Sequence, residues 1–456
     1  MAGRNRRRRG RRGVPGRVLI ILENEPAWTS HRVRKQVDTL LENGYSVTLI
    51  TRKADAITAL LGDGLPGNDQ FRGRPGVRVL EYPMSLDGQG LLGYLAEYGY
   101  AFLAAAFLSF RALLTGGIDV VQFCAPPDIY FPLAWVLKWL GVRVLIDQRD
   151  LLPELYAARF DQVRPALLSA LRTCERLSHR SADRIICTNE YQRSRALKES
   201  GLPDSQVQIV RNGPVLTHVT EAKADESLKR GRRYLCCWVG SMGRQDRVDL
   251  LVQSIDHVVH DLGRKDCQFT IIGPGECLAS NQELAHRLDL DEWVHFTGLQ
   301  LPQEVFRYLA TADIGLDASL QADVSPVKLY EYMAFGLPVV AFDLQETRAL
   351  AGGAAVLAEA GDIKAHGQAI EALLSSPERR RELGETGRAR VRDELAWDHQ
   401  ARAYAGVIRQ LCAKPGRYSD GRDAGAATTG TATTGTATTG TAGPDNVSMA
   451  GAGDHA

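Results

Sequence analysis

The chain has 456 residues, of which 44% are apolar and 24% are charged. This length suits two or three globular domains, and the composition excludes a collagen, a coiled coil and a mostly disordered chain. The formal charge of +1 hides seven arginines among the first twelve residues, so the rest of the chain is slightly acidic. A slightly acidic body argues against a surface that coats nucleic acid, and we expect no nucleic-acid partner.

The cysteines and the first apolar run indicate a cytoplasmic protein. Eight cysteines are scattered without a C-x-x-C pair, so neither a zinc site nor a disulfide framework is indicated. The apolar run at 18–22 is too short for a secretory signal. We therefore expect the chain in the reducing cytoplasm.

Both ends of the chain are expected to be disordered. Residues 1–15 are mostly arginine and glycine, and residues 415–456 contain repeats of Ala-Thr-Thr-Gly-Thr. Neither end has the apolar surface that offsets the entropy of ordering. The arginine-rich start is interpreted as a solubilising arm, as a wrongly assigned start or as a segment attracted to anionic lipid.

The first half of the chain alternates short apolar strands with amphipathic helices. A strand at 17–22, a helix at 30–43 and a second strand at 46–51 form one βαβ unit. Further strands are predicted at 118–124, 142–146, 184–188 and 207–210, with helices at 129–140 and 190–200. This pattern predicts a parallel sheet that helices cover on both faces.

The segment 91–114 in this half is strongly apolar. Only Glu97 and Arg111 are charged in it, and the thirteen uncharged residues between them are too few to span a membrane. We expect a helix that is either buried against the sheet or lies at a membrane interface.

A second domain follows a polar stretch at 217–233. Strands are predicted at 234–239, 268–272, 294–297, 314–316 and 339–342. The α/β chain is thus divided into two doubly wound, Rossmann-like domains at 16–214 and 234–414, the second with a closing helix, joined by a linker at 215–233. Ligands bind at the carboxyl ends of the strands in such sheets, so two domains facing each other form a cleft.

A helix after the fourth strand of the second domain is marked at both ends. Ser325 is the expected N-cap, Pro326 the first helical residue, and Gly336 lies just past the end. The free N–H groups at the helix start favour an anion, and Lys328 adds a positive charge. Glu331 lies three residues further on, where its carboxylate can accept hydrogen bonds from a ribose. The alternative is a surface Lys–Glu pair on an ordinary capped helix.

The spacing Asp323-x7-Glu331, followed by Tyr-Met-Ala-Phe-Gly-Leu-Pro-Val-Val, resembles the signature of retaining glycosyltransferases of family 4, which have the GT-B fold. The resemblance covers roughly residues 17–412, with weaker matches at 32–34, 147–154, 210–214, 240–245 and 272–275. It implies that Glu331 holds the donor ribose and that Asp323 contacts the donor sugar. It also implies that the first domain binds the acceptor and that the second binds the donor, a nucleoside diphosphate sugar.

The chemistry of such a donor needs fixed positive charge. Departure of the nucleoside diphosphate leaves negative charge on the phosphates while the sugar becomes oxocarbenium-like. Arg244, Lys328 and the helix start at Ser325 are the candidates to stabilise that charge. Asp323, Lys328 and Arg244 are therefore the expected catalytic residues.

Two loops after strands of the second domain are expected beside the donor. Gln245 ends the match at 240–245, and Gly273 and Gly275 form either a plain turn or a side-chain-poor loop that a nucleotide approaches. No metal or other cofactor is expected, because family 4 enzymes generally work without a metal. The one Asp-x-Asp pair, Asp289 and Asp291, is expected in a loop at the amino edge of the sheet.

On the acceptor side the expected residues are His31, Arg32, Arg149 and Asp150. The chain departs from the family pattern here, because Arg149 stands where a histidine is usual. His31 either substitutes for that histidine or is a surface residue in the first turn of a helix. In the donor domain, Asp246 and Arg247 occupy the places of a usual Lys-Gly pair.

These observations predict a retaining glycosyltransferase that moves a sugar to a glycan, a lipid-linked sugar or a secondary metabolite, as in polysaccharide or cell-envelope synthesis. Two alternatives stay open: an epimerase of sugar nucleotides with the same fold, and a non-catalytic relative that binds nucleotide. The segment 91–114 and the arginine-rich start add an expectation of peripheral contact with the inner face of a membrane.

Overall fold

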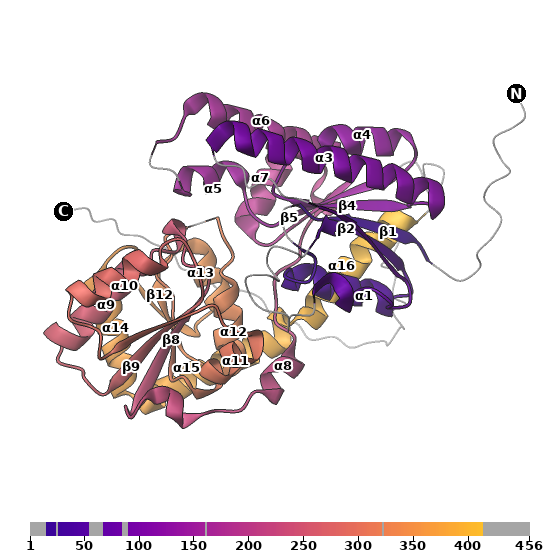
Figure 1. Ribbon diagram of the computed structural model, residues 1–456. Helices are drawn as coiled ribbons and strands as arrows, with labels where there is room; N and C mark the ends of the chain where they lie inside the picture. The colour runs from indigo at the N-terminus through magenta and orange to yellow at the C-terminus, as the bar shows by residue number, and fades with distance from the viewer. Residues whose placement is uncertain are drawn as a thin grey trace, which may run out of the picture. The chain divides into compact units, whose positions relative to one another are not determined.

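The computed structural model describes residues 15–23, 26–53, 67–83, 90–159, 162–321 and 323–413. Within them lie two parallel β-sheets, each with helices on both faces (Figure 1). The predicted pair of doubly wound α/β units is therefore confirmed. The ends that we expect to be disordered, apart from Pro15, lie outside the described residues.

The first sheet has seven parallel strands in the order β3-β2-β1-β4-β5-β6-β7. They are β1 (Arg17–Ile21), β2 (Ser46–Arg52), β3 (Val77–Tyr82), β4 (Val120–Ala125), β5 (Arg143–Gln148), β6 (Arg184–Cys187) and β7 (Val207–Ile209). Along β1, Val18 and Ile20 enter one hydrophobic core and Leu19 and Ile21 enter the other. Both faces of this sheet are thus buried, as its nearly continuous apolar strands predict.

Helices cover both faces of the first sheet. They are α1 (His31–Glu42) on one face and, on the other side, α3 (Gly90–Thr115), α4 (Phe131–Trp139), α5 (Leu152–Arg159), α6 (Pro165–Ser181) and α7 (Glu190–Ser200). In α1 the buried residues Val33, Val37 and Leu40 recur at helical spacing and form its inner stripe. Short helical turns lie at η1 (Gly67–Gln70) and η2 (Asp204–Gln206).

The second sheet has six parallel strands in the order β10-β9-β8-β11-β12-β13. They are β8 (Tyr234–Val239), β9 (Cys267–Ile272), β10 (Val294–Gly298), β11 (Ile314–Leu316), β12 (Val339–Phe342) and β13 (Ala355–Ala358). Cys236 and Trp238 pack in one core, and Leu235 and Cys237 pack in the other, so this sheet is also buried on both faces.

The helices of this second half are α8 (Leu216–Glu221), α9 (Val248–Asp256), α10 (Leu278–Arg287), α11 (Pro302–Thr311), α12 (Val327–Phe335), α13 (Gln345–Ala351), α14 (Ile363–Ser375) and α15 (Pro377–Arg390). Shorter turns are η3 (Glu226–Lys229), η4 (Arg244–Asp246), η5 (His257–Asp261) and η6 (Val391–Leu395). Residues of α9 and α14 pack with Cys236 and Trp238, whereas residues of α12 pack with Leu235 and Cys237.

The last helix, α16 (Trp397–Cys412), packs on the first sheet. Its buried side chains Trp397, Tyr404, Ile408 and Leu411 share a core with β1 and α1. The prediction assigned this closing helix to 234–414, but its apolar face is buried against the other sheet. The chain therefore returns to the first sheet after the last strand of the second sheet.

The apolar segment 91–114 is helical, as predicted, and forms most of α3. Ala101, Ala105, Leu108 and Ala112 are buried against the sheet at helical spacing. By length and mean hydropathy, Ala96–Thr115 is also long enough to cross a membrane, and 28% of that stretch is buried inside the molecule. One face of α3 is therefore core and the opposite face is exposed.

Candidate active site

The start of α12 differs from the prediction. The N-cap is Pro326 and makes no side-chain cap, so the prediction of Ser325 as N-cap is wrong. The Ser325 hydroxyl lies 3.0 Å from the Tyr330 hydroxyl and donates to a Glu346 carboxylate oxygen at 3.3 Å. The Ser325 hydroxyl therefore bonds to Tyr330 and Glu346 and does not cap the backbone amides at the start of α12. The other end is as expected, because Gly336 has a φ of 73°.

Glu331 lines a cavity of about 510 Å³. Other lining residues come from α1, from the turn before it and from residues 212–219. Burial raises the pKa of Glu331 to about 7, and the positive charge of Lys35 opposes that rise. Burial likewise lowers the pKa of Lys35 to about 7, with the charge of Arg32 lowering it further. A carboxylate and an amine whose pKa values both lie near 7 therefore line the same cavity, with the Lys35 ammonium donating to the carbonyl oxygen of Gly213 at 2.6 Å.

Lys328 lies in different surroundings from Glu331. Its ammonium group donates to Asp317 at 3.0 Å, lies 3.7 Å from an Asp246 oxygen and sits 4.4 Å from the centre of the Trp238 ring. Asp246 belongs to η4, the turn that also carries Arg244 and Gln245. Lys328 therefore contacts the predicted loop after β8 through Asp246. Asp246, in the place of a usual lysine, supplies a carboxylate to Lys328.

Gly273 is fixed by packing between loops. It follows β9 and has a φ of +136°, and a Cβ there would overlap the carbonyl oxygen of Gly240. A Cβ on Gly275 would similarly overlap the backbone of Met242. The loops after β8 and β9 therefore touch backbone to backbone, which explains both glycines beyond a plain turn. Nucleotide approach to this loop stays a prediction.

Asp323 is held by the first half of the chain. Its carbonyl oxygen accepts hydrogen bonds from Asn189 at 2.8 Å and from Gln192 at 3.3 Å. Gln192 also donates to the carbonyl oxygen of Arg149 at 2.8 Å, so the predicted residues Asp323 and Arg149 share one partner. Burial raises the pKa of Asp323 to about 6, and the charge of Asp150 adds to that rise.

Arg32 is buried, lines the cavity and forms an ion pair in the first half of the chain. Its guanidinium donates to Asp147 at 2.7 Å, to the carbonyl oxygen of Val210 at 2.8 Å and to Asn212 at 2.8 Å. Burial favours the neutral form of Asp147, but the charge and hydrogen bonds of Arg32 lower its pKa below the usual value. Arg32 therefore holds the stretch that follows β7.

Of the other acceptor-side residues, His31 and Arg149 line this cavity, whereas Asp150 does not and accepts a hydrogen bond from Gln148 at its carbonyl oxygen at 2.6 Å. His31 is exposed, lines the cavity, and places Nδ1 2.6 Å from an Arg34 nitrogen. The Arg149 side chain lines the same cavity and donates to Ser30 at 3.4 Å. His31 is thus an exposed first residue of α1 that also lines the cavity.

The predicted residues do not form a single group. His31, Arg32, Arg149 and Glu331 surround the cavity. Lys328 meets the turn of Arg244 and Gln245, whereas Asp323 meets the first half through Asn189 and Gln192.

Several important partners were missed from the sequence. Lys35 and Gln192 follow no motif that we recognised, although they touch the site directly. Arg211, which pairs with Glu346, lies inside the match at 210–214, and Asp147 opens the match at 147–154. The motifs that contain Arg211 and Asp147 could be recognised in the sequence. Their partners, Glu346 and Arg32, could not, because they are more than a hundred residues away in the chain.

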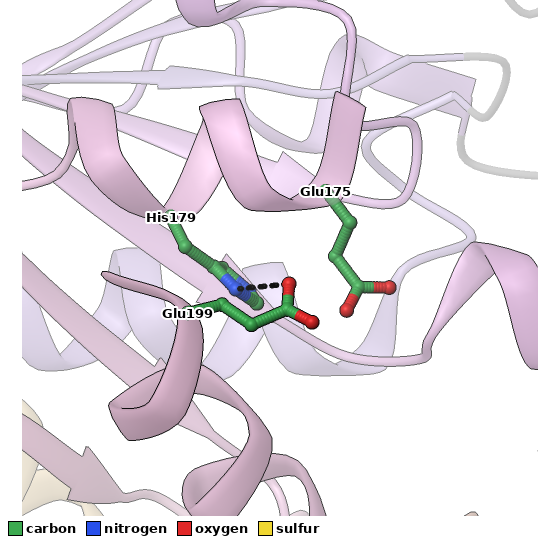
Figure 2. A group of neighbouring side chains, drawn as sticks. All are labelled: Glu175, His179 and Glu199. Atoms are coloured by element: carbon green, nitrogen blue, oxygen red, sulfur yellow. Dashed lines mark ion pairs between the residues drawn. The ribbon is translucent and has the colours of Figure 1, made fainter. Parts of the chain in front are cut away.

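One group among the described residues has the spacing of a metal site. Glu175 and His179 on α6 and Glu199 on α7 present ligand atoms within 4.8 Å of one another (Figure 2). The guanidinium of Arg195 already lies 2.9 Å from Glu175 and 3.1 Å from Glu199. None of these three residues is among the predicted site residues. The absence of a metal at the donor site stays a prediction.

Two family models match the chain. The model described as "Glycosyl transferase 4-like domain" matches residues 29–213, and the model described as "Glycosyl transferases group 1" matches residues 233–376. The first match lies over the seven-stranded sheet, and the second spans the six-stranded sheet.

Curated relatives match over parts of their length. The chain is 25% identical over 173 residues to an MMP alpha-(1->4)-mannosyltransferase of Mycolicibacterium hassiacum, covering 36% of this chain and 42% of that protein. It is 27% identical over 259 residues to an alpha-maltose-1-phosphate synthase of Mycolicibacterium smegmatis, covering 52% and 66%. The chain thus matches between about two fifths and two thirds of the length of these relatives.

Solved structures resemble almost the whole described chain. Sucrose-phosphate synthase from Thermosynechococcus elongatus superposes with a TM-score of 0.68 at 18% identity, covering 87% of this chain and 99% of that one. Anabaena Alr3699/HepE in complex with UDP and glucose gives a TM-score of 0.66 at 13% identity, covering 87% and 100%. At these identities the likeness establishes the fold.

Proposed function

Because the chain belongs to the family 4-like glycosyltransferases and has their GT-B fold, we propose that it is a retaining hexosyltransferase. It would move a sugar from a nucleoside diphosphate sugar to a glycan, lipid-linked or secondary-metabolite acceptor. The donor class is supported by the Anabaena structures, which are complexes with UDP and with UDP-glucose.

The observation that carries this proposal is the position of Glu331. The second acid of the Asp323-x7-Glu331 signature lines a cavity large enough for part of a nucleotide, and Lys35 lines the same cavity. A carboxylate there can accept two hydrogen bonds from the vicinal hydroxyls of a ribose. Lys35 supports the ionised form that accepts such bonds most strongly.

The diphosphate is proposed to lie near Lys328 and Arg244. Lys328 is held by Asp317 and Asp246, so bound phosphate would replace carboxylate oxygens around one ammonium group. Fixed cations at this point stabilise the charge that develops as the donor bond breaks. The departing phosphate is the proposed acceptor for the proton of the incoming hydroxyl.

Asp323 is proposed to contact the sugar itself. With a pKa near 6, its carboxylate is mostly ionised at pH 7 and can accept hydrogen bonds from sugar hydroxyls. Asn189 and Gln192 fix the backbone of Asp323, so the first half of the chain sets where this acid lies.

We further propose a cytoplasmic location at the inner face of a membrane. No cysteine among the described residues forms a disulfide, which suits a reducing compartment. A relative from Corynebacterium glutamicum carries the name of a phosphatidylinositol monomannoside mannosyltransferase, which supports a lipid-linked acceptor.

A donor-turnover assay tests this function. Purified protein is incubated with UDP-, GDP- and ADP-sugars, with and without a detergent extract of membrane lipids, and the released nucleoside diphosphate and the remaining donor are measured. We expect release that rises with extract and falls in Glu331→Ala but not in the matched surface variant Glu382→Ala. Epimerised donor without an acceptor would establish the epimerase instead. Nucleotide binding without any turnover would establish a non-catalytic relative.

A further inference from the structure

The outward face of α3 is a continuous apolar stripe. Tyr100, Leu103, Phe107, Phe110 and Leu114 are all exposed and recur at intervals of three and four residues. Leu103 is 67% exposed, Phe107 69% and Leu114 86%. Since the opposite face of α3 is buried in the sheet core, this stripe is a surface of the folded protein.

The neighbouring helix α4 extends the apolar surface. Trp135, Val136, Trp139 and Leu140 are exposed, and Trp139 is 84% exposed. The Phe102 ring of α3 stacks on Tyr130, the residue just before α4, with the ring centroids 5.9 Å apart. We call these exposed residues of α3 and α4 the apolar face. Soluble monomers rarely leave such large side chains clustered in water.

A row of cations lies on the next helix of the same layer. In α6, Arg172, Arg176 and Arg180 are exposed at intervals of four residues. The inward face of α6 buries Glu175, the one acid of this helix. We call the three exposed arginines the arginine row.

The two surfaces are joined side by side. Figure 1 shows α3, α4 and α6 together over one side of the first sheet. Lys138 of α4 donates to the carbonyl oxygen of Ser181, at the end of α6, at 3.0 Å. Because the three helices form one layer, their outward faces belong to one side of the protein.

We propose that this side of the first domain docks on a membrane that contains anionic lipid. The apolar face would enter the boundary between head groups and acyl chains, where tryptophan is favoured, and the arginine row would meet lipid phosphates. This docking rests on the membrane location proposed above, and α3, α4 and α6 form the surface that contacts the membrane. The helix α3 lies flat on the membrane, because its inner face is part of the sheet core.

Vesicle sedimentation at low and high salt tests the docking. Full-length protein is mixed with vesicles of phosphatidylcholine, with and without phosphatidylglycerol. We expect pelleting with the anionic vesicles that decreases as salt rises. A chain that begins at residue 13 separates the arginine row from the seven arginines that precede it, and should still pellet.

Two sets of surface variants locate the contact. The apolar variant carries Leu103→Ser and Phe107→Ser, with Leu299→Ser and Leu301→Ser of the second domain as its exposed control. We expect the apolar variant to lose pelleting and its control to keep it. Brominated lipid should also quench the fluorescence of the wild type more than that of Trp139→Phe.

The charge variant replaces the arginine row by glutamine, and its control replaces three exposed arginines elsewhere. The control substitutions are Arg348→Gln, Arg379→Gln and Arg392→Gln. The charge variant should bind anionic vesicles more than about tenfold more weakly, because each arginine near the surface adds attraction. Its control should bind as the wild type does.

Other results overturn the proposal. No pelleting of the wild type, or equal pelleting of all variants, would exclude this surface. A wild-type dimer in sedimentation velocity that Leu103→Ser with Phe107→Ser converts to monomer would assign the apolar face to a second copy of the chain. Nucleotide binding is measured on the same proteins, so loss of docking with normal nucleotide affinity leaves the proposed enzyme intact.

Discussion

The buried pair of Arg32 and Asp147 ties α1 to β5 and to the stretch after β7. Removing the guanidinium would take the closest cation from a buried carboxylate and leave Arg149, 3.7 Å away. We expect Arg32→Met to lower the free energy of unfolding by about 3–5 kcal/mol, measured by urea denaturation at pH 7.

The exposed pair of Arg17 and Asp119 is the matched control, because its partners are 2.9 Å apart but face solvent. Arg17→Met should cost only about 0–1 kcal/mol. The pKa of Asp147 is lowered in the folded state, so its contribution is present above the ordinary carboxyl pKa and is lost as the pH falls. Equal losses in both variants would mean that Asp147 is not anchored by Arg32.

Glu331 and Lys35 predict how donor binding depends on pH. The pKa of Glu331 is raised to about 7, so the carboxylate gains charge as the pH rises from 6 to 8. An ionised carboxylate accepts stronger hydrogen bonds from ribose hydroxyls, so nucleotide affinity should rise several-fold over this range, by about 1 kcal/mol. Glu331→Gln should lack this rise, and because Lys35 loses its charge over the same range in both proteins, the difference between the two isolates Glu331. A rise of the same size in Glu331→Gln would assign the titration to another group.

At the scale of elements, the loops after β8 and β9 depend on glycine. Gly273→Ala would combine an unfavourable backbone with overlap against Gly240, and we expect a loss of roughly 3 kcal/mol or more in unfolding free energy. Gly298 also has a positive φ, of +65°, but a Cβ there would meet nothing within 4 Å. Gly298→Ala should therefore cost only about 1–2 kcal/mol. Thermal unfolding compares the two, and an equal shift would refute the loop contact.

The sequence predicted the elements whose boundaries are marked locally. The strand at 46–51 and the helix at 190–200 are confirmed because Gly44 and Gly201 have positive φ at their flanks and Asn189 caps the helix. β3 and β13 were not predicted, and Arg78 and Glu81 interrupt the apolar pattern of β3. Local pattern therefore specifies most of both sheets and misses two of their four edge strands.

The site was predictable only in part, because its partners come together over long distances in the chain. The Asp323-x7-Glu331 spacing pointed to the right helix, yet no pattern connects Tyr404 of α16 to Gln122 of β4, which its hydroxyl contacts at 2.6 Å. Gln122 in turn donates to Gln36 at 2.9 Å, beside Asp147. Such contacts follow from the crossing of α16 back to the first sheet, and not from any local motif.

At the scale of the whole molecule, we expect activity to survive chelation. The one metal-like group among the described residues, that of Glu175, lies apart from Lys328 and Glu331 and is already bridged by Arg195. Turnover of donor should therefore be unchanged in EDTA, measured by release of nucleoside diphosphate. Loss of turnover that manganese restores would contradict a metal-free donor site.

The central claim is that the nucleotide of the donor lies against Glu331. Calorimetry with UDP, GDP and ADP measures it most directly in the wild type, in Glu331→Ala and in the exposed control Glu382→Ala. We predict that one nucleotide binds the wild type and the control equally, and that Glu331→Ala binds it more weakly by about 1–3 kcal/mol. Unchanged affinity in a folded Glu331→Ala protein, or no binding of any nucleotide by the wild type, would contradict the claim.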